Sequence, residues 1–118
     1  MKDILHPTDL VGEFLSEVAF VQDYIQLSFG DAGLTFLSHP SIKTDSFSGK
    51  FPDAGSRDAL CSLIGKEISS VQLDDEKELV LVFESKDTVT LLLDLKSRSP
   101  WGEVLHFSSG GGTIFGVW

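Results

Sequence analysis

The chain has 118 residues, 42% of them hydrophobic and 23% charged, so we expect one folded domain rather than a disordered segment. Its formal net charge of −9 argues against nucleic acid and anionic membrane surfaces as partners, because both repel an acidic protein. The single cysteine excludes an internal disulfide and a cysteine-based zinc site. Without an apolar run of signal-peptide or transmembrane type, the sequence predicts a cytoplasmic protein.

Two parts of the sequence match each other, and this internal repeat organises the prediction. The gaps in the alignment fall in turn-like stretches, where insertions are best tolerated. We therefore expect a single domain over residues 1–118, with repeat halves of about 8–38 and 57–95. The aligned segments are 10–18 with 63–71, 24–29 with 78–83, and 34–37 with 89–92.

Each half is predicted to begin with a short helical turn that ends at a glycine. Gly12 and Gly65 stand where a left-handed residue usually terminates a helix. The second helix is expected to start at Ser56 or Asp58 and to run to about Ile64. Its buried face is expected to comprise Leu60, Leu63 and Ile64, and Cys61 is expected to be a buried, unreactive thiol.

Three strands are predicted to follow each helical turn. In residues 24–29, 78–83 and 89–95, apolar residues occupy every second position, as in strands that pack one face against the core. After Pro100, residues 104–107 and 113–118 predict a closing hairpin (about 101–118) around a glycine-rich turn. The expected fold is α+β and mainly antiparallel β. It comprises two pseudo-symmetric halves, each a helical turn plus three strands, and a C-terminal β-hairpin, arranged as a sheet or a partly open barrel.

The outward positions of the second half are apolar, unlike those of the first half. Val80, Val82 and Leu92 occupy these positions and need a cover. Two covers are considered: the terminal hairpin with its aromatic residues, or the interface of a homodimer or partner.

The stretch 38–56 between the halves is predicted to be a long loop rich in turn residues. Phe47 and Phe51 are either anchors of a binding loop or side chains that fold back onto the core. His39, with Asp45 near it in sequence, allows a general base, but no nucleophile motif accompanies them. The sequence therefore favours a protein that is not an enzyme.

An acidic run at Asp74, Asp75 and Glu76 is predicted to form a solvated turn. The ligand spacing of a calcium-binding loop is missing there. No metal and no cofactor is predicted.

Residues 57–66, RDALCSLIGK, followed by alternating strands, resemble a pattern found in small bacterial proteins of unassigned role. Some of those proteins are similar to immunity proteins, which neutralise toxins. The resemblance covers about half of the chain and carries no catalytic residues. It implies a bacterial protein that acts by binding.

The leading hypothesis is a non-catalytic, acidic protein-binding module of immunity-protein type with a basic partner. A second hypothesis is a ligand-binding domain or small enzyme with a pocket between the halves, lined by His39, Asp45 and Arg57. A third is a structural homodimer through Val80, Val82 and Leu92. The candidate binding residues are His39, Asp45, Phe47, Phe51, Asp53, Arg57, Asp74, Asp75 and Glu76.

Overall fold

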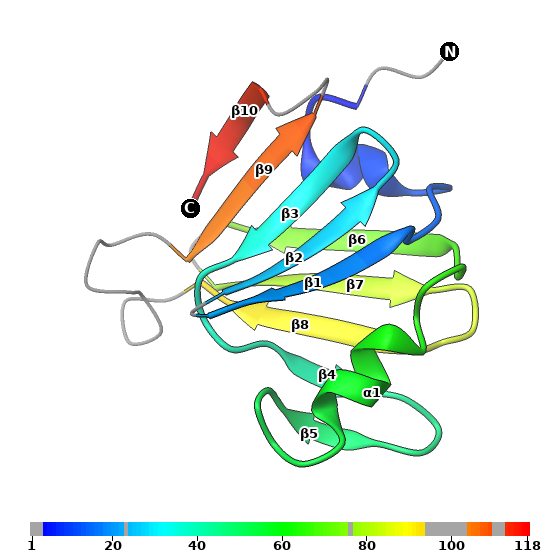
Figure 1. The fold of residues 1–118 in the computed structure, drawn as a ribbon. Coiled ribbons are helices and arrows are strands. Elements are labelled where there is room, and N and C mark those ends of the chain that lie inside the picture. The colour runs from blue at the N-terminus through cyan, green and yellow to red at the C-terminus, as the bar shows by residue number, and fades with distance from the viewer. Residues whose placement is uncertain (1–3, 23, 76, 94–103, 110–112) are drawn as a thin grey trace.

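The structure is a computed structural model that describes residues 4–22, 24–75, 77–93, 104–109 and 113–118, with the backbone alone at 113–115 (Figure 1). Glu76, Leu95 and Trp101 and the side chain of Phe115 lie outside this description. The described strands form two five-stranded antiparallel sheets and no closed barrel. Figure 1 shows the sheets as two layers, one in front of the other.

The first sheet has the strand order β1-β2-β3-β9-β10. Its strands are β1 (Glu17–Val21), β2 (Tyr24–Phe29), β3 (Ala32–Phe36), β9 (Leu105–Ser109) and β10 (Thr113–Val117). The second sheet has the order β5-β4-β8-β7-β6. Its strands are β4 (Ser41–Lys43), β5 (Ser48–Lys50), β6 (Ile68–Asp74), β7 (Glu78–Phe83) and β8 (Thr88–Leu92). Two short helices complete the fold, the 3₁₀ helix η1 (Pro7–Leu10) and α1 (Ser56–Cys61).

Alternating side chains of both sheets fill the space between the layers. In β2 and β7, the apolar residues are buried and their neighbours half-buried, as the two-residue period predicts. The core joins the inner residues of both sheets to Leu10, Leu60 and Leu63 from the helical segments. Burial of this apolar surface is the main force that holds the two layers together.

A set of backbone hydrogen bonds links the two halves at positions that the sequence alignment pairs. The N–H of Gly12 donates to the carbonyl of Ile68 (2.9 Å), and the N–H of Gly65 donates to the carbonyl of Leu15 (2.7 Å). Both glycines have positive φ, 89° and 90° respectively, which confirms that each helical turn ends in a left-handed residue. Each terminal glycine thus donates a backbone hydrogen bond to the corresponding position of the other half.

The prediction of a long loop over 38–56 is wrong, because this stretch contains the hairpin β4–β5. β4 pairs with β8, so the hairpin extends the sheet of the second half. The C-terminal hairpin β9–β10 pairs with β3 and extends the sheet of the first half. The hairpin that follows the first half therefore joins the sheet of the second half, and the hairpin that follows the second half joins the sheet of the first. The C-terminal hairpin thus lengthens the first sheet, while Trp101 and the side chain of Phe115, which were expected to cover β7 and β8, lie outside the described residues.

The helix α1 is shorter than predicted and begins differently. It ends at Cys61, and its N-cap is Gly55, with no side-chain cap from Ser56 or Asp58. Leu60 and Leu63 are buried as expected, but Cys61 is exposed and Ile64 is 44% exposed. The chain leaves the helix at Cys61, so the residues beyond it no longer follow a helical face.

Candidate functional site

Four side chains from β1, from the two ends of the β4–β5 hairpin and from α1 meet where β1 lies near α1. They are Phe20 in β1, His39 before β4, Phe51 after β5 and Arg57 in α1; we name them the aromatic–arginine cluster. The Phe20 and Phe51 rings stack with centres 5.9 Å apart and planes 11° apart. The His39 ring meets Phe51 edge-on at 5.5 Å.

Arg57 completes the cluster through its guanidinium group. The guanidinium carbon lies 4.8 Å from the centre of the Phe51 ring and 5.7 Å from that of Phe20. Both distances are within the range of cation–π attraction. Within the described residues, Arg57 has no carboxylate at ion-pair distance. Its N–H groups are therefore available to a binding partner.

The turn after β5 positions Phe51. The N–H of Phe51 donates to the carbonyl of Pro40 (2.9 Å), which ties the end of the hairpin to its beginning. The N–H of Asp53 donates to the carbonyl of Lys50 (2.7 Å), and a carboxylate oxygen of Asp53 accepts from the N–H of Lys50 (3.1 Å). Gly55 then takes a φ of 89° and starts α1, which brings Arg57 over the ring. Asp53 thus has a structural role that its sequence context did not reveal.

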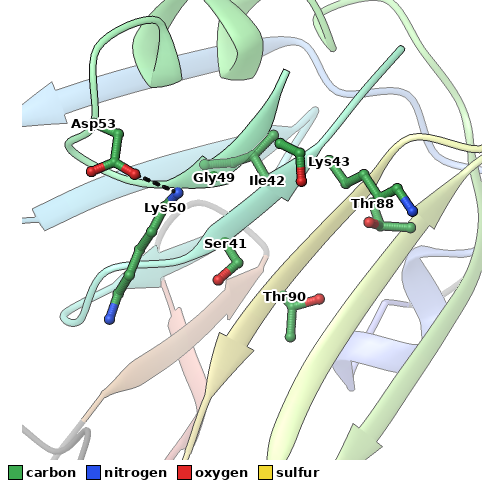
Figure 2. Close-up of a pocket in the computed structure, with 9 residues that line it drawn as sticks. Ser41, Ile42, Lys43, Gly49, Lys50, Asp53, Thr88 and Thr90 are labelled. Carbon is green, nitrogen blue, oxygen red and sulfur yellow. Dashed lines mark hydrogen bonds between the residues drawn. The ribbon is translucent and has the colours of Figure 1, made fainter. Parts of the chain in front are cut away.

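A second feature lies on the outer face of β5, β4 and β8, and we name it the hydroxyl groove (Figure 2). It has a volume of about 500 Å³. Cross-strand pairing sets its side chains in two rows, because directly opposed residues point to the same face. One row is Lys50–Ser41–Thr90, and the other is Ser48–Lys43–Thr88. Ile42, Gly49 and Asp53 complete the lining.

The acidic residues predicted to bind a basic partner are not gathered in one place. Asp45 lies in the β4–β5 turn, at the Thr88 end of the second sheet, because Lys43 pairs with Thr88. Asp74 and Asp75 lie at the β6–β7 turn, at the opposite end, where Glu78 pairs with Leu92. β4 also separates Asp45 from His39, so the structure does not bring the predicted acid–base pair together.

Asp75 has a specific partner in Trp118. The indole Nε1–H of Trp118 donates to a carboxylate oxygen of Asp75 (2.7 Å), and the His6 ring lies edge-on to the indole at 6.3 Å. This contact holds the end of the chain against the β6–β7 turn. A shallow depression of about 530 Å³ beside it is lined by Gln72, Leu73, Asp74, Lys77 and Glu78.

Val80, Val82 and Leu92 lie on the outer face of the second sheet, next to the hydroxyl groove. Val80 pairs with Thr90 and Val82 with Thr88, so the apolar strip continues the rows of the groove. The two valines are half-buried by their neighbours, and Leu92 is 43% exposed. Leu92 therefore leaves part of this strip accessible to a partner.

The remaining predicted residue, Phe47, folds back onto the core, which is one of the two alternatives considered for it. A Cβ on Gly49 would lie 3.0 Å from the Phe47 ring, so a side chain at that position would crowd the ring. The two depressions described above both lie on outer surfaces, and the pocket expected between the halves stays a prediction.

An ion pair between the half-exposed Lys66 and the buried Asp87 lies in the second half. Lys66 Nζ lies 2.7 Å from Asp87, whose side chain is 5% exposed, and Ser85 donates to the same carboxylate oxygen. Burial opposes ionisation of Asp87 most strongly. Hydrogen bonds from Lys66 and Ser85 and the charge of Lys66 together outweigh it and lower the pKa of the Asp87 carboxyl below its ordinary value.

Searches of protein families, of curated proteins and of solved structures find no match to this chain. No helix in the described ranges is long and apolar enough to cross a membrane. Within those same ranges, no three His, Cys, Asp or Glu side chains are grouped as metal ligands. The resemblance to immunity proteins stays a prediction, and the function has to be argued from the two surface sites.

Proposed function

We propose that this protein is a non-catalytic binding module that holds a protein partner through the aromatic–arginine cluster. The observation that carries the proposal is the stack of Arg57, Phe51 and Phe20 on an exposed edge of the sandwich. Arginine and large aromatic residues dominate the energetics of protein interfaces. Because the rings hold the guanidinium in place, little side-chain freedom is lost on binding.

A comparison of corresponding positions supports this choice. We infer that the chain consists of two copies of one unit, each with a helical turn, three strands and a hairpin. In this scheme Phe51 corresponds to Trp118, since each N–H donates to the carbonyl at the start of its own hairpin, that of Pro40 or of Leu105. Trp118 is tied down by Asp75, whereas Phe51 carries an arginine with open N–H groups. The two copies therefore differ at the residue that ends the hairpin, and we place the binding site at the copy that carries Phe51.

The chemistry of the cluster defines what the partner offers. A carboxylate fits the N–H groups of Arg57, and an apolar side chain fits beside the exposed edge of Phe20, which is 37% exposed. The net charge of −9 favours a partner with net positive charge, because long-range attraction speeds association. The basic toxin that the immunity-like resemblance implies is a partner of this kind.

Site-specific photo-crosslinking tests the proposal. p-Benzoylphenylalanine replaces Phe20 in one variant and the more exposed Phe14 in a control, because Phe14 lies away from the cluster at the link to Glu67. We expect one defined protein to be crosslinked in cells from position 20 and not from position 14. Arg57→Ala should weaken binding of that protein at least tenfold. Equal crosslinking from both positions, or binding unchanged by Arg57→Ala, would contradict the proposal.

A homodimer is the second candidate, and the partly exposed apolar strip of Val80, Val82 and Leu92 favours it. Sedimentation equilibrium at increasing protein concentration tests this candidate. A dimer that Leu92→Glu converts to a monomer would establish it. A monomer at all concentrations would remove it, and would leave the proposed partner site unaffected because the strip and the cluster are separate surfaces.

A further inference from the structure

The hydroxyl groove has a chemical character that the proposed protein contact does not use. Its walls carry side chains that donate hydrogen bonds: the hydroxyls of Ser41, Ser48, Thr88 and Thr90 and the ammonium groups of Lys43 and Lys50. Their positions are fixed by the strand register, with Lys43 opposite Thr88 and Ser41 opposite Thr90. The groove is therefore a rigid array of donors on a sheet rather than a mobile loop.

The two lysines flank the array. Lys50 pairs with Ser41, and Lys43 is two residues further along β4, so the lysines are diagonal neighbours. Diagonal residues on adjacent strands are about 7–8 Å apart at their Cα atoms. Figure 2 shows the two ammonium groups at opposite ends of the groove, with Ser41 and Thr90 between them. In the part of the chain that the structure describes, neither lysine forms an ion pair with a carboxylate.

Asp53 adds an acceptor at one end of the groove. Its Oδ2 atom accepts from the Lys50 N–H, while Oδ1 has no hydrogen-bond donor among the described residues. A Cβ at Gly49 would lie 3.2 Å from the Asp53 carboxylate, so glycine leaves space for this carboxylate beside the groove. The site thus offers cations for an anionic group, hydroxyls for further oxygens, and one carboxylate oxygen that accepts from a hydroxyl.

We propose that the hydroxyl groove binds a small polyhydroxylated anion, that is, a phosphorylated or carboxylated sugar. The anionic group lies at Lys43 or Lys50, and the sugar hydroxyls bond to the serine and threonine hydroxyls and to Asp53. The volume of about 500 Å³ matches that of small-ligand sites, which span about 300–1,000 Å³. Since the protein as a whole repels anions, the hydroxyl contacts are needed to select such a ligand over a simple anion.

Isothermal titration calorimetry of the full chain with four probes tests this inference. The probes are glucose 6-phosphate, glucuronate, glucose and inorganic phosphate. We expect at least one of the two anionic sugars to bind, and to bind at least tenfold more tightly than both glucose and inorganic phosphate. Preference between the two sugars identifies the anionic group. No binding by either sugar, or equal binding of glucose or phosphate, would overturn the proposal.

Variants locate the site. Lys43→Gln combined with Lys50→Gln should weaken binding of the anionic sugar at least tenfold, and Thr90→Val should weaken it several-fold. Lys77→Gln combined with Lys86→Gln is the matched control, because it removes the same charge from exposed positions outside the groove. Amide shifts in ¹H–¹⁵N spectra should cluster on β4, β5 and β8. An equal loss in the control pair, or shifts centred elsewhere, would overturn the assignment. Because Arg57 is untouched, these outcomes are independent of the proposed protein contact.

Discussion

The guanidinium of Arg57 lies 4.8 Å from the centre of the Phe51 ring, although five residues separate the two and the chain turns sharply between them. The contact depends on the hairpin end, on the turn held by Asp53 and on the left-handed Gly55. It joins α1 to the hairpin and to β1 through Phe20. The same contact that we assign to binding therefore also contributes to stability.

Arg57→Ala should lower the free energy of unfolding by about 0.5–1 kcal/mol, because an exposed cation–π contact contributes about that amount. Arg57→Lys should recover only part of the loss, since lysine lacks the planar group that stacks on a ring. Urea denaturation at neutral pH measures both effects. Lys77→Ala is the control and should change stability by less than about 0.5 kcal/mol. Equal effects of the two alanine variants would contradict a stabilising contact at Arg57.

Lys66→Met should destabilise the protein by about 1–3 kcal/mol at neutral pH, because it leaves the buried Asp87 carboxylate without its charged partner. The pKa of Asp87 in the folded state lies below its ordinary value of 3.8, so the ion pair contributes stability above that pH and loses it as the pH falls. The difference between wild type and variant should therefore shrink below about pH 4. Urea unfolding of wild type and Lys66→Met at pH 7 and at pH 3 measures this difference in stability. A difference that stays constant over this range would show that Asp87 is not the group responsible.

Much of the fold follows from local patterns in the sequence. The alternation of apolar residues in β2, β7 and β8 identifies strands and their inner faces, because a strand that packs on a core has a period of two. Gly12 and Gly65 identify the ends of the helical turns for the steric reason that only glycine adopts positive φ without cost. These features depend on neighbours in sequence, and the structure agrees with them.

The β4–β5 hairpin and the candidate site depend on distant neighbours and were missed. Each of the two strands has three residues, and Ile42 is the one fully buried side chain among them, so no period is visible. The sequence identifies Phe51, His39 and Arg57 as candidates, the last two in one predicted pocket, but their contact with Phe20 requires β1 to lie beside α1. The sequence contains one signal for Phe20: it follows Val18 by two residues, so in a strand both side chains lie on the same face. In the structure this is the inner face, because Phe20 pairs with the buried Ile25.

Gly12→Ala and Gly65→Ala should each destabilise the protein by about 1–2 kcal/mol, because an L side chain at positive φ is strained by roughly that amount. The space around both glycines is open, with no atom within 4 Å of an added Cβ, so the loss reports on the backbone alone. Thermal unfolding measures it. Lys86 provides the reverse test, because it already has a side chain at a positive φ of 73°. Lys86→Gly should therefore leave stability unchanged or raise it. Tolerance of alanine at both glycines would contradict the left-handed conformation.

Ser56→Ala should leave stability unchanged or raise it by about 1 kcal/mol, although Ser56 is completely buried at the first position of α1. Its Oγ has no hydrogen-bond partner among the described residues, so the protein loses the hydration of that hydroxyl without compensation. Alanine removes the polar atom, fills almost the same space and is the better helix former. Ser62→Ala is the control, because the Ser62 hydroxyl donates to the carbonyl of Ala59 (2.6 Å) and its loss should cost about 0.5–1 kcal/mol. Chemical denaturation measures the free energy of unfolding of both variants. A greater loss for Ser56→Ala than for Ser62→Ala would contradict the prediction and would mean that the buried hydroxyl holds an ordered water molecule in solution.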